Sequence, residues 1–346
     1  MLHEVRERLP EGTRSRIEGF VAFMSPHLII GVHALLLLAA GVAGFEWPLA
    51  ALFVCLIGTI SLVAEGTGRF SVLRWVLPKG PSYNLVVHQG VEAPRGSVVV
   101  AAPLDAPRWK PSRPQWMARP LRSVVGAAIV VTAILALRAL AEPWGRPTQT
   151  IYVASLLVFG VTVLLGALMQ RGPGADEDAS GCAAALELHR RFAAEPLEGL
   201  DLWVVFTGCA HAYQNGMHAF LAMHRKRFRG PALVVVLDDP GRPPFGAVRS
   251  EGALTPLRPR PTGPALIERL RWTGLDIPEV DRPQPSDAHA ATEWGYRALA
   301  LSGADAPGEA QTTCRAVDVA EAAIRMYADD LARVPSPAPS EPQEAS

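Results

Sequence analysis

The chain has 346 residues, of which only 19% are charged, and its mean hydropathy is +0.17. This composition is too apolar for an ordinary soluble protein and predicts a membrane-embedded part. Lys plus Arg and Asp plus Glu each number 33, so the formal net charge is +0 and no strong positive field favours nucleic acid as a partner. The four cysteines include no C-x-x-C pair, which argues against a disulfide framework and fits a reducing compartment.

Four apolar segments are expected to cross a membrane: Leu28 to Phe45, Pro48 to Ala64, Leu121 to Ala141, and Thr150 to Met169. Each comes close to the roughly 20 residues that span the hydrocarbon layer. The first segment begins too late, and is followed too soon by the second, to be a simple cleaved signal peptide. The segments therefore predict four transmembrane helices in two hairpins.

The orientation of these hairpins follows from the basic residues. The two hairpin turns offer only Glu46 and Arg146, whereas the segments on the other side are rich in basic residues: Arg6, Arg8, Arg14, Arg16, Arg69, Arg74, Lys79, Arg108, Lys110, Arg113, Arg119 and Arg122. The positive-inside rule then places both termini and the polar region in the cytoplasm, with the chain in the cell inner membrane. A transporter or channel is not favoured, because the spans show no paired ionisable residues.

Strands and helices alternate in the polar part of the chain. We predict strands at 84–87, 97–102, 200–207, 233–237 and 296–301, and helices at 179–192, 214–228, 263–272 and 317–333. This order predicts an α/β sheet with helices on both faces. The expected domains are an N-terminal segment (1–27), hairpin 1 (28–64), the first part of the α/β domain (65–120), hairpin 2 (121–169), the main part of the domain (170–333) and a disordered tail (334–346).

Clustered carboxylates stand between the last apolar segment and a predicted helix, in the octet from Gly174 to Gly181. Asp176, Glu177 and Asp178 indicate a metal-binding corner close to the membrane. The octet resembles the G-A-D-D-N-A-S-G signature of the co-catalytic zinc aminopeptidases (metallopeptidase family 28). In that family the second acidic residue bridges two metal ions, and here Glu177 holds its position.

Two strand ends extend the resemblance. The strand at 98–102 is followed by Pro103 and Asp105, which is similar to the family's H-x-D, with Pro103 at the position of the first metal-binding His and Asp105 at the carboxylate that orients it. The stretch from 206 to 220 is similar to the family's strand, E-E pair and G-S-x-x-F helix. Ala210 stands at the general base of the pair, and His211 stands at the metal ligand.

Later landmarks fix the remaining positions. Asp238 matches the Asp that binds the second metal in the family's L-D, and the segments 286–288 and 295–296 match the landmarks S-D-H and G-[IY]-P. Counting on from Gly295 places Cys314 at the final His ligand, with Gln311 as the competing position if a loop is shorter.

The resemblance implies a zinc-aminopeptidase-like mixed sheet flanked by helices, and it leaves two interpretations of the site open. In one, catalysis has been lost and the surviving polar groups satisfy one another. In the other, Glu177, His211 and Cys314 hold one zinc ion, with Asp238 or water as the fourth ligand. Asp105, Asp176 and Asp178 then lie around the ligands.

Ala210 cannot accept a proton, so the family's route to a metal-bound hydroxide is closed at that position. We therefore expect no catalytic residue at the family's base position and a binding or scaffold role at the membrane surface. The alternative is a membrane-bound metallopeptidase with a single zinc ion and a base drawn from Asp176, Asp178 or Asp238.

Hairpin 2 leaves the domain after Asp105 and returns just before Gly174, and both points border the active-site rim in the family. An extended chain from Met169 to Glu177 spans at most about 30 Å. We therefore expect the cleft to face the inner leaflet. The expected partners are the lipid bilayer and a membrane-proximal peptide, lipid headgroup or membrane protein, with no nucleic acid.

Overall fold

The computed structural model describes residues 1–23, 26–66, 79–105, 120–141, 145–169, 179–211, 213–252, 262–282, 285–303 and 308–333. The acidic residues Asp176, Glu177 and Asp178, and the tail 334–346, lie outside these ranges.

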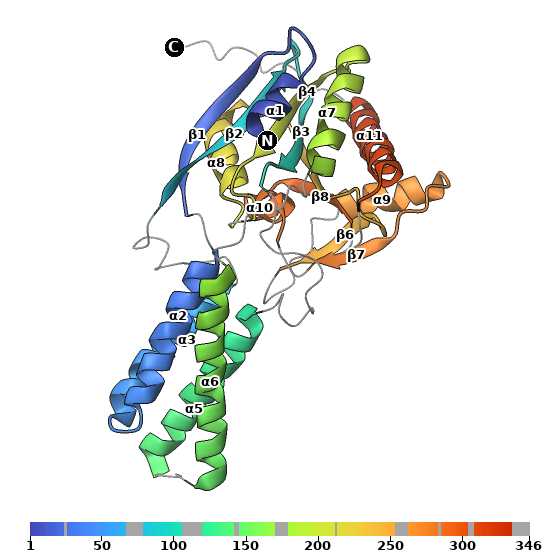
Figure 1. Cartoon of the computed structure of the whole chain (residues 1–346). Helices are drawn as coiled ribbons and strands as arrows, with labels where there is room; N and C mark the ends of the chain where they lie inside the picture. The colour runs from blue at the N-terminus through green and yellow to red at the C-terminus, as the bar shows by residue number, and fades with distance from the viewer. Residues whose placement is uncertain are drawn as a thin grey trace, which may run out of the picture.

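Eight strands form one mixed sheet in the order β1-β2-β4-β3-β5-β8-β6-β7 (Figure 1). Their bounds are β1 (Ser15–Ala22), β2 (Gly80–Gln89), β3 (Gly96–Pro103), β4 (Leu200–Thr207), β5 (Ala232–Asp238), β6 (Gly246–Glu251), β7 (Glu279–Arg282) and β8 (Arg297–Ser302). Strands β4, β3, β5 and β8 run parallel. Every residue of β3, β4 and β5 is buried, which is typical of parallel strands covered on both faces.

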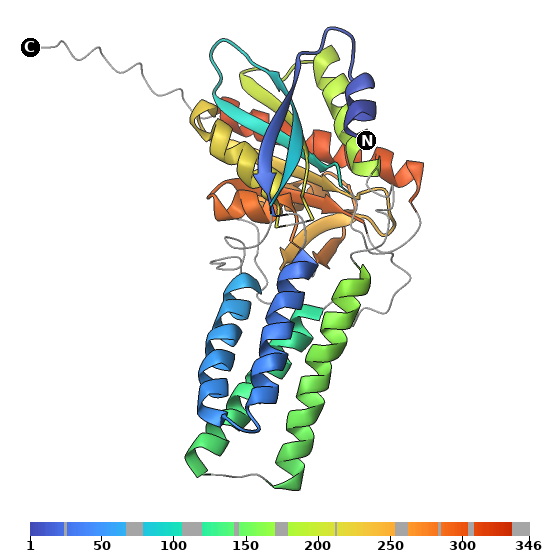
Figure 2. The same ribbon diagram turned by 60° about the vertical axis from the view of Figure 1, so that its left-hand side comes forward.

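Helices cover both faces of the sheet, as predicted (Figures 1 and 2). Because successive side chains of a strand point to opposite faces, Val100, Val204 and Val235 pack in one core and their neighbours Val99 and Val205 in the other. The first core is covered by α7 (Ala179–Ala194), α9 (Thr262–Trp272) and α11 (Ala310–Arg333), and the second by α8 (Asn215–His224) and α10 (Asp287–Glu293). The short helices α1 (Leu2–Glu7) and η1 (Arg225–Arg227) complete the described part of the domain.

Several elements differ from the sequence-based prediction. The strands β1, β6 and β7 and the helix α10 were not predicted, because they are short or carry many polar residues. Strand β1 lies in the segment set apart as N-terminal, yet it pairs with β2 from Ser15 to Ala22. Helix α8 ends at His224, before the predicted Phe228, and α11 begins at Ala310 rather than at Val317.

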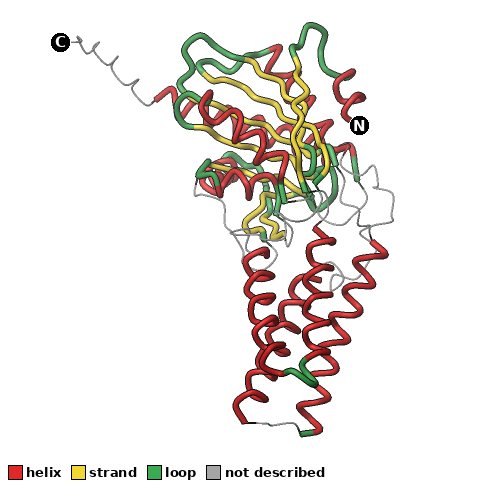
Figure 3. Tube along the Cα trace, turned by 90° about the vertical axis from the view of Figure 1, so that its left-hand side faces the viewer, coloured by secondary structure: helices red, strands yellow, loops and turns green. Residues whose placement is uncertain are grey.

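The four apolar segments form a helical bundle that projects from one edge of the sheet domain (Figure 2 and Figure 3). Its helices are α2 (Pro26–Ala43), α3 (Pro48–Gly66), α5 (Pro120–Ala141) and α6 (Arg146–Met169), packed around a shared apolar core. Large apolar side chains also cover its outside: Leu35, Leu36, Leu49, Phe53, Ile57, Ile60, Ile129, Leu137, Ile151, Leu157, Val161 and Leu164. An exposed apolar surface of this extent is typical of a bundle that contacts lipid.

Three of these helices are long and apolar enough to cross a membrane: Pro48–Gly66, Leu121–Leu140 and Arg146–Leu164. A helix of 19 residues is about 28 Å long, close to the thickness of the hydrocarbon layer. The remaining apolar helix, Leu28–Ala43, is shorter. Three of the four predicted segments therefore have the length and apolar composition that a membrane-spanning helix needs.

The sheet meets the bundle at the carboxyl ends of the parallel strands. Strand β1 runs in the direction of β4, because each pairs antiparallel with β2. Just beyond β1, the backbone oxygen of Phe23 accepts a hydrogen bond from Nδ2 of Asn215 at 3.1 Å, and the Phe23 ring lies 6.4 Å from that of Tyr213. Helix α2 begins three residues further on, within about 11 Å of chain. The loop after β4 is therefore fastened close to the start of the bundle.

Candidate functional site

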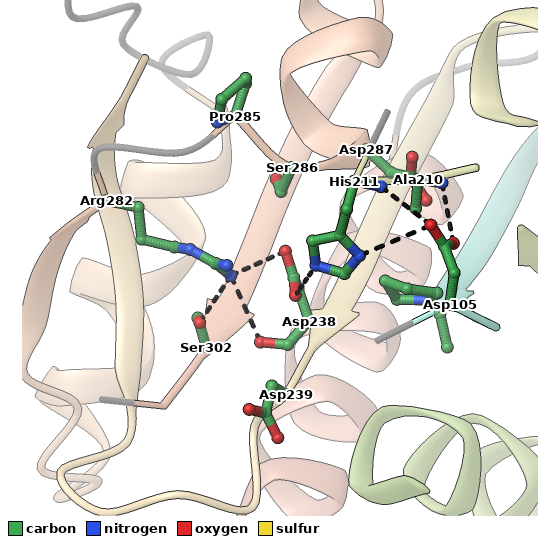
Figure 4. Close-up of polar contacts among 12 residues, drawn as sticks. Asp105, Ala210, His211, Asp238, Asp239, Arg282, Pro285, Ser286, Asp287 and Ser302 are labelled. Carbon is green, nitrogen blue, oxygen red and sulfur yellow. Dashed lines mark hydrogen bonds and ion pairs between the residues drawn. The ribbon is translucent and has the colours of Figure 1, made fainter. Parts of the chain in front are cut away.

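Polar side chains gather where β3, β4 and β5 end (Figure 4). We call this group the carboxyl-edge cluster, and its members are Asp105, Thr207, His211, Asp238, Arg282, Asp287 and Ser302. In open α/β sheets, ligands bind outside the carboxyl ends of the strands, so this edge is the expected place for a site.

Asp105 holds the loop that carries Ala210 and His211. Its Oδ1 accepts a hydrogen bond from the backbone N–H of Ala210 at 2.9 Å, and its Oδ2 accepts one from the backbone N–H of His211 at 3.3 Å. The same Oδ2 lies 3.8 Å from Nδ1 of the His211 ring. In the resemblance, Asp105 stands at the carboxylate that orients a metal-binding His, and Pro103 replaces that His. Here the carboxylate positions the loop with Ala210 and His211 instead.

This loop has an unusual backbone. Cys209, Tyr213 and Gln214 have φ angles of 51°, 63° and 50°, a left-handed conformation that costs free energy in any residue except glycine. The side chain of Gln214 holds the loop by donating from Nε2 to the backbone oxygen of Pro285 at 2.9 Å. Tertiary contacts therefore fix the position of the His211 ring.

Asp238 is a buried carboxylate that faces His211. Only 4% of its side chain is exposed, and its Oδ1 lies 3.9 Å from Nε2 of His211. Its Oδ2 lies 2.7 Å from Nη1 of Arg282 (Figure 4). The same nitrogen donates to Oγ of Ser302 at 2.7 Å. Asp238 thus contacts an imidazole on one side and a guanidinium on the other.

Asp287 lies beneath these groups at the start of α10. Its Oδ2 accepts a hydrogen bond of 2.5 Å from Oγ1 of Thr207. Burial raises the pKa of Asp287 to about 7, the hydrogen bond from Thr207 opposes the rise, and the charges of Asp238 and Asp105 add to it. This carboxyl group therefore holds its proton far more strongly than an exposed aspartate does.

Asp239 connects the edge to helix α7. It follows Asp238 with a φ of 54°, and it lies 2.6 Å from Nε of Arg242 through Oδ2. Its Oδ1 accepts a hydrogen bond from Oγ of Ser180 at 3.1 Å. Gly181 lets α7 approach closely, since a Cβ there would lie 2.4 Å from the backbone oxygen of Leu237. The start of α7 is therefore packed directly on the end of β5.

The predicted metal ligands come together only in part. His211 and Asp238 face each other, while Cys314 is exposed near the start of α11 and Glu177 lies outside the described residues. Across the parts of the chain that the structure describes, no three His, Cys, Asp or Glu side chains are grouped so that they could hold a metal ion. A catalytic zinc ion takes three protein ligands. The described residues alone therefore do not fit zinc.

Arg282, Ser302 and Thr207 were not assigned to the site from the sequence. Ser302 and Thr207 could have been proposed because each follows or ends a predicted strand, where site residues gather. Arg282 gave no such signal, because it ends a strand that the sequence did not predict.

No protein-family model matches the chain, and no curated protein matches it significantly. Solved structures similar to it include LapB from Legionella pneumophila, with 11% identity and a TM-score of 0.43 over 93% of this chain and 80% of that one. A Zn-dependent exopeptidase from Parabacteroides distasonis has 9% identity and a TM-score of 0.45, over 94% of this chain and 86% of its own. BSAP, a zinc aminopeptidase from Bacillus subtilis, has 11% identity and a TM-score of 0.41 over 71% of this chain, which spans 50% of the BSAP chain. Likenesses of this size establish neither a family nor an activity.

Proposed function

We propose that the chain is a multi-pass membrane protein whose aminopeptidase-like α/β domain binds a ligand at the carboxyl-edge cluster without hydrolysing it. The observation that supports this most directly is Ala210, which occupies the position of the general base in the resemblance.

The surroundings of Ala210 support the same conclusion. Its methyl group cannot take a proton from water, and its backbone N–H already donates to Asp105. Of the three other candidates for a base that the sequence suggests, Asp238 is the one among the described residues, and it is paired with Arg282 at 2.7 Å. The guanidinium group therefore occupies an oxygen with which this carboxylate would have to accept a proton.

We further propose that all four bundle helices, α2 included, cross the inner membrane, with both termini and the α/β domain in the cytoplasm. The distribution of basic residues and the apolar outside of the bundle support this placement. Because the loop after β4 is fastened close to the start of α2, the ligand class that fits is membrane-proximal: a peptide, a lipid headgroup or another membrane protein.

The proposal is tested by incubating the purified full-length protein in lipid vesicles with unblocked peptides, with zinc or cobalt supplied. We expect no release of amino acids above the buffer control. We also expect no release by the variant Ala210→Glu, because Arg282 still pairs with the carboxylate of Asp238. Release by the wild type that stops when a chelator is added contradicts the proposal.

A second candidate function is a hydrolase with one zinc ion. The observation that favours it is that Oδ1 of Asp238 accepts no hydrogen bond from any described group and faces Nε2 of His211. Glu177 or Cys314 then has to complete the ligand set. Under this candidate function, Cys314→Ser lowers both peptide release and bound zinc, whereas under the first it changes neither.

A further inference from the structure

The guanidinium group of Arg282 is a feature of the carboxyl-edge cluster that the zinc-aminopeptidase resemblance does not explain. Its Nη1 lies 2.7 Å from Oδ2 of Asp238, and it donates to Oγ of Ser302 at 2.7 Å and to the backbone oxygen of Asp238 at 3.4 Å (Figure 4). The Arg282 side chain is 18% exposed. One nitrogen of this largely buried side chain therefore contacts oxygen atoms at the ends of both β5 and β8.

Acidic groups surround this guanidinium. Asp239 follows Asp238, and Glu251 pairs with Arg282 in the register of β6 and β7. Burial raises the pKa of Asp239 and of Glu251, and the positive charge of Arg282 opposes the rise in both. A buried carboxylate needs a compensating charge. Arg282 lies against Asp238, and it also acts on Glu251 and, after Arg242, on Asp239.

Carboxylate, hydroxyl and backbone oxygens are also ligands that a divalent cation accepts. A metal ion and a guanidinium group are therefore alternatives at the same oxygen of Asp238. The guanidinium carries its charge at every physiological pH and is weakly hydrated, so it suits a buried position better than a lysine ammonium does.

We propose that Arg282 is a built-in cation that takes the place of a metal ion at Asp238 and makes the carboxyl-edge cluster independent of metal. The inference rests on the proposed function in treating this cluster as the ligand site. Its test measures bound zinc instead of peptide hydrolysis, so the two proposals can fail separately. Peptide release by a zinc-free protein contradicts only the proposed non-hydrolytic function. Zinc bound at Asp238 contradicts only the proposal that Arg282 replaces a metal ion.

The experiment compares zinc binding by calorimetry and metal analysis in the full-length wild type, Arg282→Met, Arg282→Lys and the double variant Arg282→Met, Asp238→Asn. The matched control is Arg249→Met, which removes an exposed arginine that pairs with Asp281 at 2.5 Å. We expect Arg282→Met to bind zinc at least about tenfold more tightly than the wild type, because a nearby positive charge no longer opposes the ion. The double variant loses this gain, and Arg282→Lys and Arg249→Met resemble the wild type.

Two results overturn the proposal. One is a wild type that holds about one zinc ion per chain that Asp238→Asn removes. The other is a folded Arg282→Met that gains no zinc affinity. If Arg282→Met does not fold, the double variant decides: recovery of the fold shows that Asp238 needed this cation, and failure to recover counts against it.

Discussion

The helical bundle and the sheet domain both bury polar groups, but they satisfy them differently. In the bundle, Nε2 of His33 lies 3.0 Å from Oγ of Ser61, and the hydroxyl of Tyr152 donates to the backbone oxygen of Gly41 at 2.6 Å. In the carboxyl-edge cluster the buried groups include charged pairs, such as that of Asp238 with Arg282. Neutral partners join helices to one another, whereas a collection of charges is costly to bury and is typical of a binding site.

The described part of the bundle also buries ionisable side chains. His33 lies buried in α2 and Glu65 lies buried near the end of α3. The contacts of His33 with Ser61 and with the backbone oxygen of Ile29 at 2.9 Å are those of a side chain that holds α2 against α3. These contacts explain His33 without a transport role.

The largest expected effect concerns Asp287 and the dependence of stability on pH. Its pKa is raised from 3.8 to about 7 in the folded protein, so between these values the unfolded state binds fewer protons than the folded state. Stability contributed by the protonated group is present at low pH and is lost as the pH rises towards 7. Asp287→Asn removes this loss, on the order of 4 kcal/mol at neutral pH.

The measurement for Asp287 is the thermal melting temperature of wild type and Asp287→Asn across this pH range. The control is Asp329→Asn, which changes an exposed carboxylate on α11. Parallel curves for wild type and Asp287→Asn would falsify the assignment of a buried, proton-retaining group.

The next largest expected effect is a loss of stability when a side chain is added at Gly181, where α7 packs closely on β5. Gly181→Ala places a Cβ 2.4 Å from the backbone oxygen of Leu237, which cannot move without shifting β5. We expect a loss of about 3 kcal/mol, measured by chemical denaturation, because overpacking against backbone forces a structural shift. Gly126→Ala in α5 meets no atom within 4 Å and serves as the control, with unchanged or slightly higher stability.

Arg138 provides a smaller effect within the bundle. It donates from Nη1 to the backbone oxygen of Gly44 at 2.5 Å and from Nη2 to that of Phe45 at 2.8 Å, and both residues lie directly after the end of α2. Arg138→Met is expected to lower stability by about 2 kcal/mol, because charged groups form stronger hydrogen bonds. Arg146→Met, at the start of α6, is the control; equal losses in both variants contradict a capping role for Arg138.

The smallest effect is that of Tyr152→Phe, which removes the hydroxyl bond to Gly41 without changing the ring. We expect a loss of about 1 kcal/mol or less, as is typical of one hydrogen bond between membrane helices. Tyr83→Phe, on an exposed side chain of β2, is the reference. A loss as large as that of Gly181→Ala contradicts the view that neutral polar contacts in the bundle are individually weak.

The sequence predicted the elements with strong periodicity and failed where polar residues mask the pattern. The buried run from Leu200 to Thr207 was predicted with the bounds that the structure has, because parallel strands are apolar along their whole length. Strand β1 was missed, because Arg16 and Glu18 interrupt its apolar pattern and its pairing with β2 is long-range. Such pairing is a tertiary property that no local window contains.

The sequence predicted some members of the carboxyl-edge cluster but not the groups that they contact. Asp105, His211 and Asp238 lie together as their places after strands suggested. Their actual partners could not be derived, because Asp105 bonds to backbone N–H groups and Arg282 comes from an unpredicted strand. A sequence motif predicts which residue types lie near the end of a strand, whereas the pairing of charges depends on three-dimensional distances.

Both hairpins leave and re-enter the domain between neighbouring strands. The first separates β1 from its antiparallel neighbour β2, and the second separates β3 from its parallel neighbour β4. During synthesis, the ribosome therefore makes each of these strands before the partner that lies beyond the hairpin exists. The sheet therefore cannot close until both pairs of apolar helices have been synthesised.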